Sequence, residues 1–169
     1  MFLTFIITSI FAISMLTAAY KDALTMTIPN WASLMVLIGF FVTIPFVWPG
    51  WAEFGEHLAV GLSIFVLGFV VFALRGLGGG DAKLMAATSF WWTWPDLFLY
   101  LVYTTLAGGI FALGILLGRK MIPVALLPAP WMQRLFKEEK HMPYGLALAV
   151  GALVTLPQSE IFKNALGLS

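Results

Sequence analysis

The sequence predicts an all-α polytopic membrane protein, and three features of the chain point to this class. Of its 169 residues, 61% are hydrophobic and only 10% are charged, whereas soluble domains carry about 25% charged residues. The mean hydropathy is +0.97. The apolar residues fall into six runs separated by polar or helix-breaking stretches. We therefore expect a single membrane-embedded domain over residues 1–169 with six transmembrane helices.

Charges and helix breakers mark the ends of these runs. The first run holds 19 residues without a charge and ends at Lys21 and Asp22, close to the ~20 residues that a spanning helix needs. Pro29 and Asn30 precede the second run, and residues 49–56 are expected to form a polar turn before the third. The six predicted spans cover residues 2–20, 31–48, 57–74, 82–94, 97–118 and 143–156.

The fourth run is too short to cross a membrane in the ordinary way. Its 13 residues reach roughly 20 Å, against a hydrocarbon core about 30 Å thick. Trp91, Trp92 and Trp94 are expected to form an interfacial aromatic belt at its far end. That arrangement would place Asp81, at its near end, about 10 Å inside the membrane.

A short amphipathic helix is expected in the longest polar connection, residues 119–140. Four apolar side chains share one helical face there, opposite charged ones, a pattern typical of a helix that lies in the membrane interface. The apolar residues are Trp131, Met132, Leu135 and Phe136, and the charged ones are Arg134, Lys137 and Glu138.

The distribution of basic residues predicts the orientation in the membrane. Eight of the nine lie in the first, third and fifth connections, and none lies in the second or fourth. The positive-inside rule makes the basic side cytoplasmic, so both termini are expected outside the cytoplasm. The eight are Lys21, Arg75, Lys83, Arg119, Lys120, Arg134, Lys137 and Lys140.

Two acids, Asp22 and Asp81, fall at helix boundaries on the cytoplasmic side. Two neighbouring carboxyl groups share one proton, because both cannot easily be ionised. The ionised member can take a proton from water, and the protonated member can stabilise the developing oxyanion. The pair is therefore a candidate for aspartic protease chemistry, without metal or cofactor. Asp81 could instead be only an N-cap, and Asp22 only a solvated charge at a helix end.

Three glycines, Gly78, Gly79 and Gly80, directly precede Asp81. Glycine adopts backbone conformations that other residues reach only at a cost, and without Cβ atoms these residues would let a substrate backbone approach Asp81. Lys83 is either an anchor on the cytoplasmic side or a supporting residue of the site. The sequence contains no cysteine, and the two histidines, His57 and His141, are expected on opposite sides, so no metal site is expected.

Four motifs in order resemble those of the type IV prepilin peptidases, a family of GxGD intramembrane aspartic proteases. They are Asp22, Ile28-Pro29-Asn30, Gly78-Gly79-Gly80-Asp81-Ala82-Lys83 and Pro143-Tyr144-Gly145. The resemblance implies that Asp22 and Asp81 are catalytic and that the Pro143–Gly145 turn packs against the active site. Asn30 is expected only to stop a helix.

The resemblance also implies a substrate and a location. The closest likeness is to the short form associated with tight-adherence (Flp) pilus systems, in the bacterial inner membrane. The expected partners are a prepilin, with a basic leader and a hydrophobic helix, and the lipid bilayer, but no nucleic acid. Longer members carry a cytoplasmic insert with paired C-x-x-C motifs and also methylate the pilin. In this chain the connection after the first span is short and there is no cysteine, so no methyltransferase activity is expected.

Two classes of function follow. The first is an endopeptidase that removes the prepilin leader at the cytoplasmic face. The second is a non-enzymatic membrane protein, either a small transporter or an assembly partner, because intramembrane acids also serve in proton relays. No charge continues a polar path to the far side, which favours the enzyme. A prepilin cleavage assay would separate the two.

Overall fold

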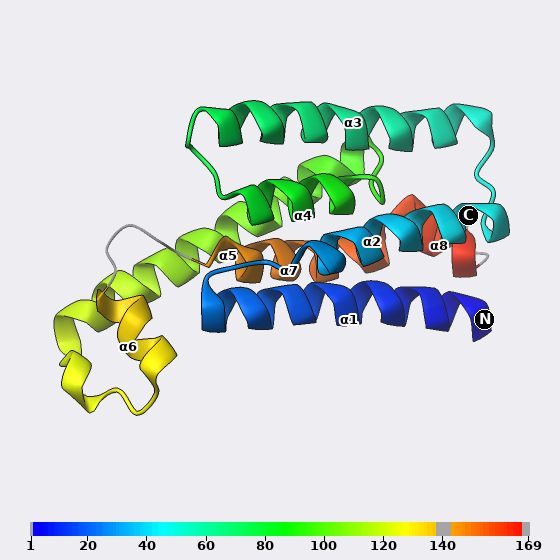
Figure 1. Cartoon of the computed structure of the whole chain (residues 1–169). Coiled ribbons are helices and arrows are strands. Elements are labelled where there is room, and N and C mark those ends of the chain that lie inside the picture. Colours follow the sequence, from blue (N-terminus) through cyan, green and yellow to red (C-terminus); the bar gives the residue numbers. More distant parts are fainter. Residues whose placement is uncertain (1, 138–142, 167–169) are drawn as a thin grey trace.

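The computed structural model describes residues 2–137 and 143–166, and within them it contains helices and no strand (Figure 1). The α-helices are α1 (Phe2–Thr25), α2 (Asn30–Thr43), α3 (Trp51–Ala73), α4 (Gly79–Ser89), α5 (Trp94–Met121), α6 (Pro130–Lys137), α7 (Tyr144–Thr155) and α8 (Glu160–Leu166). Three short 3-10 helices are η1 (Ile44–Phe46), η2 (Val124–Leu126) and η3 (Leu156–Gln158).

Six of these helices, α1 to α5 and α7, run alternately in opposite directions (Figure 1). The α1–α2 connection (residues 26–29), the α3–α4 connection (residues 74–78) and α6 lie at one end, which we call the α6 end. The α2–α3 connection (residues 47–50), the α4–α5 connection (residues 90–93) and α8 lie at the other, which we call the α8 end. This is the order of elements that the sequence predicts.

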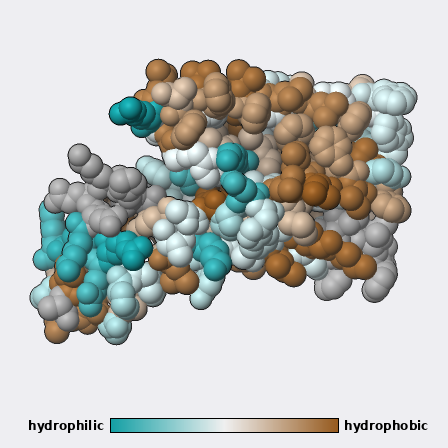
Figure 2. All heavy atoms as spheres, viewed as in Figure 1, coloured by the Kyte–Doolittle hydropathy of each residue, from teal (hydrophilic) through white to brown (hydrophobic). Residues whose placement is uncertain are grey.

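Helix length and composition support a membrane protein. Both α3 and α5 are long and apolar enough to cross a membrane alone, and α7 with η3 forms a third candidate span together with α8, bent by 46°. Figure 2 shows hydrophobic side chains along the surface of α3, with hydrophilic ones gathered around α6. The helix α2 is shorter, and α4 has only 11 residues, so six transmembrane spans stay a prediction.

The prediction of an interfacial belt is wrong for Trp91 and Trp92. Their side chains are 1% and 0% exposed and fill the centre of the bundle, whereas Trp94 is 50% exposed. The Trp91 ring packs edge-on against Phe11 with centroids 4.8 Å apart, and its Nε1 donates a hydrogen bond to the Val36 carbonyl at 3.0 Å. Core packing, and not a membrane surface, therefore fixes the far end of α4.

The polar turn expected at residues 49–56 is shorter than predicted. Gly50 precedes α3 in the left-handed region, with φ of 93°, a conformation that glycine adopts without steric cost. Helix α3 then begins at Trp51 and includes Glu53 and Glu56. The connection is thus confined to residues 47–50 and ends at this glycine, and the two acids lie on the first turns of a helix.

Close helix contacts depend on glycine at two crossings. A Cβ on Gly151 of α7 would collide with Thr104 of α5, and one on Gly61 of α3 would collide with the Phe90 ring. Small residues let helix backbones approach closely, which is the usual basis of packing between membrane helices. The α5–α7 and α3–α4 pairs therefore form close interfaces that larger residues would separate.

The predicted amphipathic helix is present as α6, and its apolar side faces the protein. The Phe136 ring reaches the Cα position of Gly118 on α5, where an added Cβ would lie 2.9 Å from it. Arg119 Nη2 donates a hydrogen bond to the Leu135 carbonyl at 2.8 Å. These contacts hold α6 against α5. Its position in the membrane interface stays a prediction, and Glu138 lies outside the described residues.

Candidate active site

Asp22 is a buried residue in the last turn of α1, with 5% of its surface exposed. The helix continues to Thr25, so Asp22 lies within it and not after its end as predicted. Its Oδ2 accepts a hydrogen bond of 2.7 Å from the backbone N–H of Gly145, in the first turn of α7. A Cβ on Gly145 would lie 2.9 Å from this oxygen. The turn that includes Pro143 and Tyr144 thus packs against Asp22 through its glycine.

Asp81 is the third residue of α4 and is only partly buried. The N-cap of α4 is Gly78, so the alternative that Asp81 is an N-cap is wrong. The Asp81 carboxylate folds back over Gly78, where a Cβ would lie 2.6 Å from Oδ2. An acidic group in the first turn of a helix interacts favourably with the helix dipole, and Asp81 occupies such a position in α4.

The glycines before Asp81 are needed for space and not for unusual backbone angles. None of Gly78, Gly79 and Gly80 has a positive φ, which corrects the expectation from their conformational freedom. A Cβ would lie 3.1 Å from Phe72 at Gly79 and 3.0 Å from Ile28 at Gly80. The α1–α2 connection can approach the start of α4 this closely because Gly80 has no side chain.

Ile28 is a residue of the site that sequence reasoning did not single out. Its side chain is 8% exposed and lies between α4 and α7. Its Cβ is 3.0 Å from the Cβ position of Gly80, and its Cδ1 is 3.0 Å from that of Gly145. Its place directly before Pro29 in the motif is the only sequence signal for it. Ile28 spaces the segments that carry the two aspartates.

Asp22 and Asp81 come together at the α6 end, although 59 positions separate them in the sequence. They are close enough for the charge of Asp22 to act on Asp81. Among residues 2–137 and 143–166, no group donates a hydrogen bond to the Asp81 carboxylate and neither acid has an ion-pair partner. The arrangement is therefore a pair of carboxyl groups with oxygen atoms free to bind water.

Lys83 and Asn30 form a second contact between the same two segments. Lys83 Nζ donates a hydrogen bond of 3.0 Å to Asn30 Oδ1. Asn30 is the first residue of α2, with Pro29 as its N-cap, so the expectation that Asn30 stops a helix is wrong. The pair links the start of α2 to the first turn of α4, two residues from Asp81.

Pro143 and Tyr144 begin α7 beside this site. Pro143 is the N-cap, and Tyr144 is 50% exposed. Together with Ala23 of α1, both line a hollow of about 220 Å³ between α5, α6 and α7. Their contribution is thus to the surface next to Asp22, whereas Gly145 makes the direct contact.

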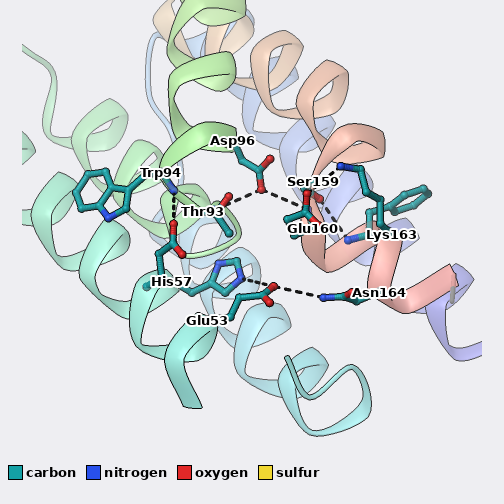
Figure 3. A network of polar contacts seen from close by, with 11 residues as sticks. Glu53, His57, Thr93, Trp94, Asp96, Ser159, Glu160, Lys163 and Asn164 are labelled. Carbon is teal, nitrogen blue, oxygen red and sulfur yellow. Dashed lines mark hydrogen bonds and ion pairs between the residues drawn. The ribbon is translucent and has the colours of Figure 1, made fainter. Parts of the chain in front are cut away.

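A separate polar cluster lies at the α8 end (Figure 3). Asp96 Oδ2 accepts hydrogen bonds from the backbone N–H groups of Thr93, at 3.4 Å, and Glu160, at 3.3 Å. Glu56 Oε1 accepts one of 2.9 Å from the N–H of Trp94. Asp96 is 4% exposed, so it is an internal helix-capping group and not a solvated loop acid.

The same cluster contains His57 and further members of α3 and α8. His57 is fully buried, and its Nε2 lies 3.9 Å from Glu53 Oε1. Glu53 also accepts a hydrogen bond from Asn164 at 3.3 Å, and Glu160 pairs with Lys163 at 2.9 Å. Within the described ranges, no group of three or more His, Cys, Asp or Glu residues could hold a metal ion. His141 lies outside these ranges.

Comparisons with known proteins show which family the chain resembles. Residues 9–113 match the model of the type IV leader peptidase family. Two curated proteins from Aeromonas salmonicida, one from strain A449, are each 25% identical to the chain over 178 aligned positions. Both are described as "Prepilin leader peptidase/N-methyltransferase".

These matches cover 85% of the chain and 56% of each relative, so the chain spans about half the length of the curated relatives it matches. No solved structure matches it significantly. The family model extends over more than half of the chain and includes both the Asp22 and the Asp81 segments. On this evidence the chain belongs to the type IV leader peptidase family.

Proposed function

We propose that this protein is an aspartic endopeptidase that removes the leader peptide of prepilins, with Asp22 and Asp81 as its catalytic pair. One observation carries the proposal: two carboxyl groups from α1 and α4 meet at the α6 end with free oxygen atoms. Family membership supplies the reaction class. Carboxyl pairs that share a proton are a general means of peptide hydrolysis without metal.

The two aspartates take different parts in this mechanism. The Gly145 N–H donates to Asp22, and a hydrogen bond to a carboxylate favours its charged form. Asp22 is therefore the base, which removes a proton from a bound water as its oxygen bonds to the scissile carbonyl carbon. Asp81, as the protonated member, donates its proton to the carbonyl oxygen. As the C–N bond breaks, the amide nitrogen takes the proton that Asp22 removed from water, and a hydroxyl of the tetrahedral intermediate returns a proton to Asp81, which restores the pair.

The reaction also requires an exposed peptide bond. Backbone carbonyls of a membrane helix are hydrogen-bonded within the helix, so the substrate must unwind at the cleavage site. The space left by the missing Cβ atoms of Gly78 and Gly79 is taken by the Asp81 carboxylate and the Phe72 ring, so it is not available to the substrate. We place this site near the cytoplasmic face of a bacterial inner membrane, in a bundle with six spans and both termini outside.

The substrate class and the absence of methyl transfer are part of the same proposal. The α1–α2 connection has only four residues, 26–29, and the sequence has no cysteine. The insert with paired C-x-x-C motifs of the longer, methylating members therefore has no counterpart after α1. We infer a Flp-type prepilin as the substrate and a product with an unmethylated amino terminus.

Cleavage by the purified protein in lipid vesicles tests this function. A Flp-type prepilin and a methyl donor would be added, and the mass of the pilin product would be measured. We expect loss of the leader after the glycine that precedes the hydrophobic helix, with no methyl group on the new terminus. An intact precursor would contradict the peptidase, and a mass increase of one methyl group would contradict the absence of methyl transfer.

The orientation has its own test, which uses the positions of the connections. Reporter fusions after Gly50, in the α2–α3 connection, are expected to report the outside, and fusions after Lys137 the cytoplasm. The same location for both fusions would contradict six spans, because the proposed topology places these positions on opposite sides.

A further inference from the structure

An open groove lies between α2 and α3, with α4 as its floor. Helix α4 packs against both neighbours, and Figure 1 shows α2 and α3 on opposite sides of it. Two hollows, of about 270 and 220 Å³, adjoin in this space at Lys83. We call this space the α2–α3 groove. It is bounded by residues 30–37 of α2, 65–72 of α3 and 79–90 of α4.

The two ends of the groove differ. At the far end the Phe90 ring contacts Gly61 of α3 and lies 6.2 Å, between ring centroids, from Phe41 of α2. Phe90 therefore closes the groove toward the α8 end. At the near end the groove is lined by Gly79 and Lys83, which flank Asp81. The groove thus begins at the α6 end, as the candidate catalytic pair does, and stops after a short distance, although neither Asp22 nor Asp81 lines it.

The lining of the groove suits an apolar helix. On its rim, Leu34 is 54% exposed, Phe65 53% and Phe69 61%. The floor carries Ala82 and Ala86, one turn apart on α4. Small residues at this spacing let a second helix approach closely in a membrane, although Ala82 and Ala86 are only 8% and 4% exposed.

Ser33 is a polar residue of the groove lining whose hydroxyl has no partner in the described part of the chain. Its side chain is 7% exposed and lines the groove. Its Oγ finds no hydrogen-bond partner within residues 2–137 and 143–166. A buried hydroxyl without a partner is costly, and rotation of the Ser33 side chain toward the groove would let a polar group of an occupant satisfy it.

We propose that the α2–α3 groove holds the first two turns of the substrate's hydrophobic helix, directly after the scissile bond. This inference rests on the proposed function. The α3 wall from residue 65 to residue 72 is about 10 Å long, or roughly two helical turns, and Phe90 prevents a longer fit. Lys83 donates one N–H to Asn30, and its ammonium group has two further N–H groups for carbonyls of the unwound segment.

Cysteine cross-linking can test this directly, because the chain has no cysteine of its own. Single cysteines would replace Leu34 and Phe69, on the two walls of the groove. Controls would replace Ile115, in the hollow beside Asp22 between α5 and α7, and Leu113, an exposed residue of α5. Each would be combined with Asp22→Asn, which is expected to keep the substrate intact, and with prepilins that carry one cysteine along the helix.

The expected result is a cross-link from Leu34→Cys and Phe69→Cys to about the first seven residues after the scissile bond, and to none further along. Cross-linking through Ile115→Cys instead, or equally through Leu113→Cys, would overturn the inference. Wild-type protein and Leu113→Cys, both with Asp22 intact, should cleave prepilin at equal rates. If they cleave but none of the groove positions cross-links, the groove assignment fails while the peptidase stands; if wild-type protein does not cleave, the proposed function fails.

Discussion

Both ends of the bundle contain buried carboxyl groups, but these groups differ in their hydrogen-bond and ion-pair partners. At the α8 end, backbone N–H groups engage Asp96 and Glu56, and Lys163 pairs with Glu160 (Figure 3). At the α6 end, Asp22 accepts one backbone hydrogen bond, and Asp81 accepts none from the described part of the chain. An unpaired acid at membrane depth is costly and marks a functional site. Hydrogen-bond and ion-pair partners, more than burial, therefore distinguish the carboxyl groups of the two ends.

The largest effect is expected from removing the acids of the α6 end. Asn is nearly isosteric with Asp, but it can neither act as the base nor share the proton. Asp22→Asn and Asp81→Asn should each reduce prepilin cleavage by at least about 1,000-fold, and the double variant should be hardly worse, because residues that act as a unit are not additive. Precursor and mature pilin would be compared in co-expressing cells at equal protein levels. Additive losses would show that the two acids act independently.

A smaller loss is expected where a glycine positions Asp22. The Cβ of Gly145→Ala would lie 2.9 Å from Asp22 Oδ2 and 3.0 Å from Ile28 Cδ1, so the carboxylate or the start of α7 must shift. A misplacement of this size can cost up to about 100-fold in rate. We expect a 10- to 100-fold lower cleavage rate. The matched control is Gly109→Ala, where an added Cβ meets nothing within 4 Å. Equal rates for the two variants would contradict the role of Gly145.

The smallest effect on catalysis is expected at the α8 end. Asp96 completes a capping box at the start of α5 with Thr93, and losing such a cap costs about 1 kcal/mol of stability. Asp96→Ala should therefore lower the thermal unfolding midpoint, while the cleavage rate per folded molecule stays at the wild-type level. A fall in that rate as large as the one caused by Asp81→Asn would contradict a purely structural role for the acids of the α8 end.

The sequence predicts the order of the helices and the meeting of Asp22 with Asp81, because alternating apolar runs place both at one end. It does not predict which way a side chain faces at a turn. Trp91 and Trp92 follow a short helix, as belt residues would, but the turn after α4 directs them into the core. The contact of Lys83 with Asn30 joins positions 53 apart, and no local pattern encodes such a contact.

The role of the glycines shows the same limit. Their number before Asp81 suggests unusual backbone angles, yet the structure uses them for close approach to Phe72 and Ile28. The space around a residue depends on elements that pack from elsewhere in the chain. The sequence places Ile28 in a motif but does not indicate its packing role, since its neighbours Gly80 and Gly145 lie on two other helices.

Labelling with a hydrophobic carbodiimide tests most directly whether the two ends hold chemically different acids. Such reagents react with protonated carboxyl groups that lie within reach of the membrane. A pair that shares one proton should react at Asp22 or Asp81, whereas the oxygens of Asp96 and Glu160 are engaged by hydrogen bonds or by Lys163. In wild-type protein we expect one label per molecule, mapped by mass spectrometry to Asp22 or Asp81, with cleavage lost in proportion to labelling. Equal labelling at Asp96 and Glu160, or full activity in protein labelled at Asp22 or Asp81, would contradict this account.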